Sequence, residues 1–123
     1  MSFAKRLSVV VTTDSSGDGT GYVDVDYGLL SQIRYVKNDF ANGVDFAITV
    51  EGTGEGLWTQ SDVNASATKA PRQATHGVDG AAALFASGGT AIQDKIAIVQ
   101  DRIKVVVAQG GDTKAGTFHF VLA

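Results

Sequence analysis

The chain of 123 residues contains no cysteine and only one proline. Without cysteine it has no disulfide, no thiol nucleophile and no cysteine-ligated zinc or iron–sulfur site. A chain of this length buries roughly two-thirds of its unfolded surface, so one domain spanning residues 1–123 needs no such crosslink. The sequence therefore predicts a single domain that its hydrophobic core stabilises.

Charged residues and long hydrophobic runs are also scarce. Charged residues make up 19% of the chain, and the net charge is −3. This balance argues against nucleic acid or an anionic membrane surface as a partner. The apolar run from Leu7 to Val11 is too short for a secretory signal or for a bilayer span, which needs about 20 apolar residues. We expect a protein made in a cytosol, with no nucleic-acid and no membrane partner.

What the chain does have is an apolar pattern of period two, with 15 glycines concentrated between the patterned segments. The clearest segment is "VDFAITV", residues 44–50, in which every second side chain is large and apolar. The same pattern predicts these further inward-facing residues: Leu7, Val9 and Val11; Val23, Val25 and Tyr27; Ile33 and Tyr35; Ile103, Val105 and Val107; Phe118, Phe120 and Leu122. Such alternation is typical of half-buried strands. We predict an all-β fold, an antiparallel β-sandwich or jelly-roll-like barrel of about seven to eight strands.

A near-repeat precedes the last strands, in which "QDKIAIV" from Gln93 is followed by "QDRIKVV" from Gln100. Two copies are too few for a coiled coil, and the isoleucine and valine content favours strands. We predict two strands, with Gln100 and Asp101 as the turn between them.

One long segment, Ser61 to Gly89, lacks the period-two pattern and is rich in alanine, threonine and serine. Within it, "GAAALFA" is compatible with one or two helical turns. Excursions of this length are often functional or ordered by a partner. The segment also contains a basic cluster without acids, formed by Lys69, Pro71, Arg72 and His76. This cluster predicts either a solvated loop or an arm that reaches an acidic neighbouring subunit.

The stretch "DSSGDG", residues 14–19, resembles the start of a calcium-binding loop. The twelfth loop position, where a calcium loop needs a bidentate glutamate, is Val25, and the flanking segments are predicted strands. We therefore predict a turn and no metal site, with weak calcium binding through Asp14, Asp18 and Asp24 as the alternative.

The sequence contains no catalytic signature. The two histidines, His76 and His119, lie far apart in the chain, and no carboxylate pair is singled out by spacing. We predict no enzyme activity and no cofactor. The single tryptophan, Trp58, is expected in the core or half-buried; an exposed Trp58 would mark a binding surface.

Three stretches carry a family resemblance: "IRYVKNDFANGVDFAITVEGTGEGLWTQSDVNASATKAPRQATH", "GAAALFASGGTAIQDKIAIV" and "DRIKVVVAQGGDTKAGTFHFVL". They resemble small β-rich structural proteins encoded among the virion genes of tailed bacteriophages. The resemblance implies a virion protein, made in the cytoplasm of the host bacterium, of the capsid cement or decoration type. Such a protein binds and stabilises the shell of major capsid protein, and we expect a homo-oligomer, dimer or trimer.

Two alternatives remain open at this point. The chain is also compatible with a structural protein of the phage neck or tail. A carbohydrate-binding module on the virion surface would use an exposed Trp58 or Tyr22 to stack on sugar rings, with Asp24 and Asp26 nearby. For the contact with a protein partner, the candidate residues are Trp58, Asn64, Lys69, Pro71, Arg72 and His76.

Overall fold

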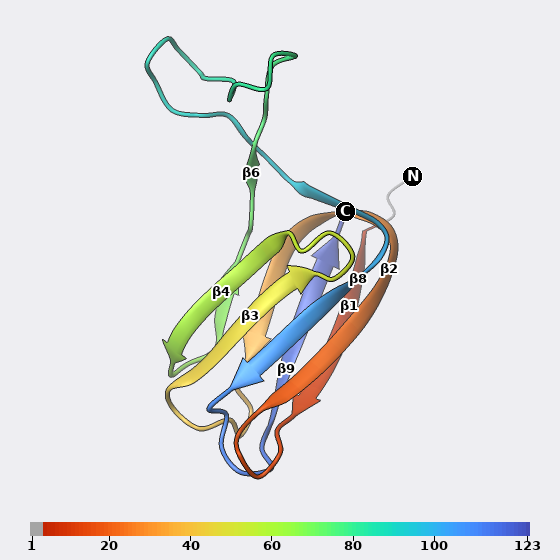
Figure 1. The fold of residues 1–123 in the computed structure, drawn as a ribbon, viewed down its shortest axis with the longest axis vertical. Helices are drawn as coiled ribbons and strands as arrows, with labels where there is room; N and C mark the ends of the chain where they lie inside the picture. Colours follow the sequence, from red (N-terminus) through yellow and green to blue (C-terminus); the bar gives the residue numbers. More distant parts are fainter. Residues whose placement is uncertain (1–3) are drawn as a thin grey trace.

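The computed structural model describes residues 4–123, and its regular elements are β-strands (Figure 1). The strands are β1 (Lys5–Thr12), β2 (Gly19–Val36), β3 (Val44–Val50), β4 (Gly56–Val63), β5 (Ala67–Lys69), β6 (Gln73–Ala74), β7 (Gln93–Asp94), β8 (Ile96–Ala108) and β9 (Ala115–Leu122). The predicted all-β class is confirmed. The two-residue strands β6 and β7 are too short to show a period-two pattern, and they bring the number of strands in residues 4–123 to nine.

Seven strands form one antiparallel sheet in the order β1-β9-β2-β8-β3-β4, with β5 paired to β2. The sheet folds over on itself because β2 is 18 residues long and belongs to both layers. Its first part pairs with β8, whereas residues 30–36 pair with β9 on one side, and residues 33–35 pair with β5 on the other. Figure 1 shows β4, β3, β8 and β2 in front, with β9 and β1 behind them.

The core lies between these two layers. Phe46 of β3 contacts Tyr35 of β2 and Phe118 of β9, with ring centroids 5.0 and 5.3 Å apart. Apart from Tyr27, the predicted inward residues are buried, or in the case of Leu7 and Val9 partly buried against the core. Phe40 enters the core from the loop between β2 and β3 and is 1% exposed. The core thus joins residues from both layers, as in a β-sandwich.

The ribbon formed by β2 and β8 exchanges its buried face halfway along. In β8 the buried residues change from Ile96 and Ile98 to Ile103 and the odd positions after it. Gln100 lies at the change with a φ of 48°, in the left-handed region. A left-handed residue in a strand disrupts the ladder locally and rotates the following side chains. The predicted turn at Gln100 and Asp101 is therefore wrong, because β8 runs through both residues as one bent strand.

The same exchange corrects the position of Tyr27. Val25 is buried, but Tyr27 is 61% exposed, although the period-two pattern places both inward. Beyond this point the buried residue of β2 is Leu30, opposite Ile96 of β8. Tyr27 therefore faces solvent because it follows the change of face.

The segment that leaves the sandwich begins later and ends later than the predicted excursion at residues 61–89. Residues 61–63 belong to β4, and β5 pairs with β2 in the main sheet. The segment that leaves the sandwich is the arm, defined here as residues 73–94, which projects from one end of the body (Figure 1). The residues of "GAAALFA" form bends and isolated bridges in the arm, not helical turns.

Candidate functional site

The predicted contact residues do not form one site. Trp58 lies on β4 and is 8% exposed, with its ring edge-to-face on Phe46 at 4.8 Å. Its Nε1 donates a hydrogen bond to Oε1 of Gln60 at 2.9 Å. The expectation of a core tryptophan is confirmed, so Trp58 presents almost no ring surface to a sugar or a protein.

Asn64 and Arg72 make contacts within the chain. The Oδ1 of Asn64 accepts a hydrogen bond from the backbone N–H of Gly43 at 2.7 Å. The Nη1 of Arg72 donates to the carbonyl oxygens of Ser31, at 3.0 Å, and Pro71, at 2.8 Å. Arg72 therefore fastens the base of the arm to β2, just where β2 passes between the layers.

Lys69, Pro71 and His76 lie along the path from the sheet to the arm. Lys69 ends β5 opposite Ile33, with its side chain exposed, and Pro71 is half-buried. His76 is exposed in the arm, where its backbone bridges to Ala82. Their roles as partner contacts stay predictions.

The arm has a regular backbone of its own. The N–H of Thr75 donates to the carbonyl of Ile92, that of Ile92 to Ala83, and that of Ala83 to Thr75, at 2.7–2.9 Å. Three chain segments thus meet in a closed cycle of backbone hydrogen bonds. Tight turns from Gly77 to Gly80 and from Ala86 to Gly89 close the loops beyond it. The arm is therefore shaped before any partner binds.

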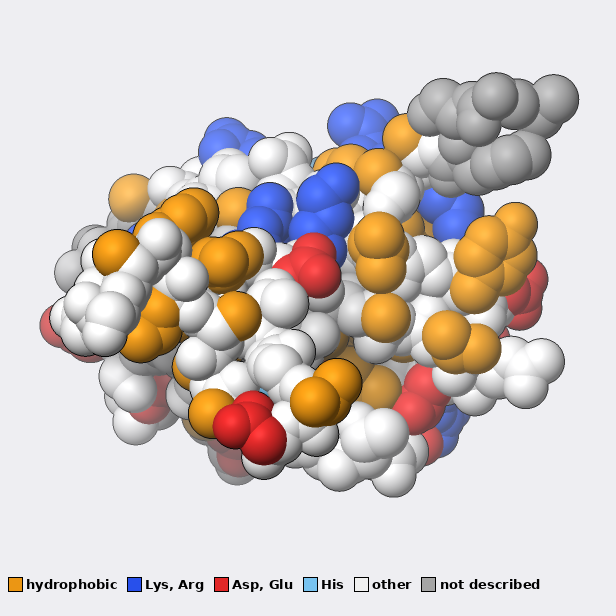
Figure 2. Space-filling model, turned by 90° about the horizontal axis from the view of Figure 1, so that it is seen from above, with side chains coloured by type: hydrophobic (Ala, Val, Ile, Leu, Met, Phe, Trp, Pro, Cys, Tyr) orange, Lys and Arg blue, Asp and Glu red, His pale blue; other side chains and the backbone are white. Residues whose placement is uncertain are grey.

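The outer part of the arm, residues 76–91, is called here the tip, and it exposes apolar side chains. Val78 is fully exposed, Phe85 is 75% exposed and Leu84 is 41% exposed. Asp79 is the one charged residue in the sequence from 77 to 92. In Figure 2, which views the molecule from the arm end, hydrophobic side chains gather over the arm at the left. Single exposed apolar residues are ordinary, but a clustered set often marks an interaction surface.

A second apolar surface lies on the body, over β2 and β8. Tyr27 stands opposite Val99, and Leu29 stands opposite Ala97, so the four side chains share one face of the ribbon. Tyr27, Leu29 and Val99 are 61%, 43% and 65% exposed. We call these four residues the strip. The strip exists because of the change of face near Gln100, which turns the aromatic and aliphatic residues beyond it outward.

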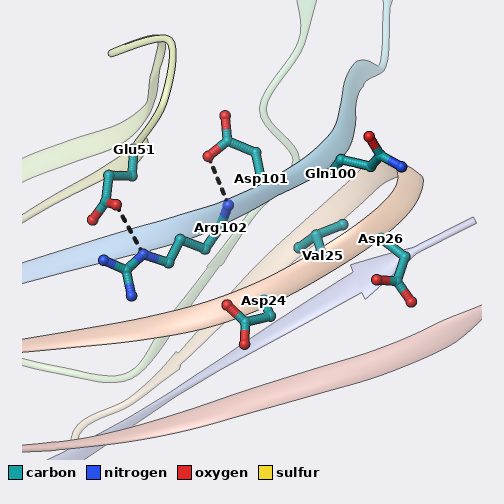
Figure 3. Close-up of a pocket in the computed structure, with 7 residues that line it drawn as sticks. All are labelled: Asp24, Val25, Asp26, Glu51, Gln100, Asp101 and Arg102. Atoms are coloured by element: carbon teal, nitrogen blue, oxygen red, sulfur yellow. Dashed lines mark hydrogen bonds and ion pairs between the residues drawn. The ribbon is translucent and has the colours of Figure 1, made fainter.

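A shallow hollow of about 410 Å³ lies beside the strip, where the ribbon changes face (Figure 3). Glu51 accepts a hydrogen bond from Nε of Arg102 at 2.8 Å, and this contact raises the pKa of Arg102 further above its ordinary value. The guanidinium of Arg102 also lies over the ring of Tyr22, 4.0 Å from its centroid. Asp24, Asp26, Gln100 and Asp101 complete the polar lining. Arg102 is thus occupied by partners within the chain.

The stretch at Asp14 forms a turn, as predicted. Oδ1 of Asp14 accepts hydrogen bonds from the N–H groups of Ser16, at 2.8 Å, and Asp18, at 3.1 Å. These bonds close the loop between β1 and β2. Within residues 4–123, no three acidic or histidine side chains are arranged to hold a metal ion. The same part of the chain contains no helix that could cross a membrane.

The comparisons with known proteins give little. No family model and no curated protein matches the chain. Among solved structures, the chain is similar to one described as "Structure of infectious bursal disease virus Gx strain", with 10% identity and a TM-score of 0.32. The match covers 98% of this chain but 33% of the other, so this chain spans about a third of that protein's length. This TM-score is too low to establish a shared fold.

The residues that sequence reasoning missed are the apolar ones of the tip and the strip. Most of the tip lies in the predicted excursion, but His76 is its one residue among the predicted contacts. The available signal was that Val78, Leu84 and Phe85 stand in a segment with almost no charge. For the strip, the available signal was "YGLL", residues 27–30, where apolar residues stand side by side and the alternation fails.

Proposed function

We propose that the chain is a non-enzymatic structural protein of a virion. In the more specific form, it is a capsid cement or decoration protein of a tailed bacteriophage. It binds the shell of major capsid protein as a homo-oligomer, and it is made in the cytoplasm of the host. The sequence resemblance suggests this setting, and the geometry of the arm supports it.

The observation that carries the proposal is the uncovered tip. The backbone of the arm is hydrogen-bonded within itself, but its valine, leucine and phenylalanine side chains face solvent and do not belong to the hydrophobic core of the domain. Burying one such side chain stabilises a contact by about 1.5–3 kcal/mol. Because the arm is already shaped, little conformational entropy opposes its binding. A rigid projecting arm of this kind suits a protein that clamps neighbouring subunits.

The sugar-binding alternative receives less support. Trp58, the stronger candidate for stacking, is buried, and Arg102 already covers one face of Tyr22. In the neck or tail alternative the arm would also bind through its exposed apolar side chains. That alternative differs only in which surface of the virion is bound.

The test uses a variant that the arm itself suggests. The N–H of Thr75 and the carbonyl of Ile92 are 2.9 Å apart, so an Asn-Gly turn can join these two residues in place of residues 76–91. This tip-replacement variant keeps β5 in the main sheet. A simple deletion across the base of the arm, such as residues 65–80, would remove β5 as well.

Wild type and the tip-replacement variant are mixed with shells assembled from the major capsid protein of the same virus, and bound protein is measured by co-sedimentation. We expect the wild type to saturate the shells and the variant to bind about tenfold more weakly or less, which corresponds to the loss of one buried apolar anchor. A wild-type protein that fails to bind shells, and that is absent from the capsid of purified virions, contradicts the cement role. Equal binding by the two proteins would show that the arm does not contribute to binding the shell.

A further inference from the structure

The tip and the strip are two exposed apolar surfaces on one chain, and neither covers the other. Val78 and Phe85 at the tip keep full or three-quarters exposure, and Tyr27 and Val99 at the strip remain more than half exposed. In Figure 2 the arm lies at the left, whereas further hydrophobic side chains gather at the right, on the side where β2 and β8 run in Figure 1. The two surfaces therefore point to different sides of the same end of the molecule.

Their chemistry is complementary. The strip lies on a ribbon that is held against the sandwich, since the opposite face of the same ribbon holds Leu30, Ile96 and Ile98 in the core. No charge interrupts the strip. The acids of the hollow, Asp26 among them, lie beside the strip near Gln100, and Lys5 also lies beside it, with its Nζ 5.5 Å from the centroid of the Tyr27 ring. The tip presents apolar side chains with Asp79 as its single charge. An approach of the tip to the strip would bury apolar area on both and bring an acid to a lysine.

We propose that the tip of one copy packs on the strip of a second copy, with Phe85 and Val78 against Tyr27 and Val99 and with Asp79 near Lys5. Because the two surfaces differ, every tip and every strip is covered only in a closed assembly, which is either a two-fold dimer in which each tip lies on the other copy's strip or a head-to-tail ring. This inference deepens the proposed function. It rests on that function only for the setting, which is a shell that carries many copies of the chain. The contact itself forms between isolated chains in solution.

Self-association is measured on the purified protein by sedimentation equilibrium. Phe85→Ser changes the tip, and Val99→Ser changes the strip. The matched control is Val10→Ser, because Val10 is also an exposed strand valine, 62% exposed against 65% for Val99, but lies on β1 away from the strip. We expect Phe85→Ser and Val99→Ser each to weaken self-association about tenfold or more, and Val10→Ser to leave it unchanged.

The charges give an independent test. Asp79→Lys and Lys5→Asp each place like charges at the contact and should weaken self-association, whereas the double variant should recover most of the loss, because the pair is restored in the opposite order. Two single effects that merely add in the double variant contradict the proposed pairing of tip and strip.

The remaining outcomes separate this inference from the proposed function. A wild-type protein that stays monomeric up to about 1 mM overturns the tip-to-strip contact, even when it binds shells. Equal weakening by Val10→Ser and Val99→Ser, or no effect of Val99→Ser, also overturns it. A protein that self-associates as described but does not bind shells supports the contact and overturns the cement role.

Discussion

At the scale of single residues, Tyr35 places a polar hydroxyl group inside the hydrophobic core. Its side chain is 0% exposed between Phe46 and Phe118, and among the described residues its hydroxyl has no hydrogen-bond partner. An unpaired buried hydroxyl destabilises a fold by about 1–3 kcal/mol. Burial also raises the pKa of Tyr35 from 10.0 to about 12, because the phenolate loses its hydration.

We expect Tyr35→Phe to raise the free energy of unfolding at pH 8 by about 1 kcal/mol, since the ring stays and only the unpaired hydroxyl goes. The two proteins should also differ in alkali. The folded state keeps the Tyr35 proton up to a pKa of about 12, while the unfolded chain loses it near 10.0. Stability from this group is therefore full below pH 10 and falls as the pH rises toward 12, by about 2–3 kcal/mol in total.

Urea unfolding at pH 8, 10 and 11 measures this difference. The wild type should lose more stability than Tyr35→Phe between pH 10 and 11. Parallel losses in the two proteins would show that Tyr35 does not titrate differently in the folded state.

At the scale of elements, the bent ribbon of β2 and β8 decides which residues are buried and which form the strip. The bend depends on Gln100, which has a φ of 48° although it is neither glycine nor asparagine. A left-handed conformation costs an ordinary residue about 1–2 kcal/mol, and a β-branched residue suffers more.

We expect Gln100→Val to lower the free energy of unfolding by about 1–2 kcal/mol, and Gln100→Gly to leave it unchanged or slightly higher. Gln32→Val serves as the matched control, because Gln32 is also an exposed strand glutamine but has no positive φ. Thermal and urea unfolding of the three variants measure the effect. If Gln100→Val and Gln32→Val behave alike, the left-handed residue is not what holds the bend.

At the scale of the whole molecule, the body and the arm are stabilised by different means. The buried hydrophobic core consists of residues of the sandwich and its loops, and none of its members comes from residues 73–94. The arm holds its shape through backbone hydrogen bonds and through Arg72 at its base.

The tip-replacement variant should therefore fold and unfold cooperatively, with a free energy of unfolding within about 0.5 kcal/mol of the wild type, because no core contact is lost. Circular dichroism and urea unfolding measure this, and they also control the binding experiments for misfolding. A decrease of several kcal/mol in the free energy of unfolding would mean that the tip stabilises the sandwich. That result would contradict the interpretation of the arm as an interaction segment.

The sequence by itself determined the strands and their buried faces wherever alternation is strict, as in residues 44–50 and at Ile103, Val105 and Val107. It also placed Trp58 in the core and identified Asp14 as a turn residue, because local propensity and burial agree there. It could not locate the change of face at Gln100, the outward position of Tyr27 or the start of the arm. Those depend on which strands pair over long sequence separations, as Gly28 does with Ile98, and a backbone rotation at one residue reverses every side chain that follows it. The sequence therefore marks only the place where the alternation fails, at residues 27–30, whereas the tertiary structure decided that these residues form an exposed strip, the surface proposed for a second copy.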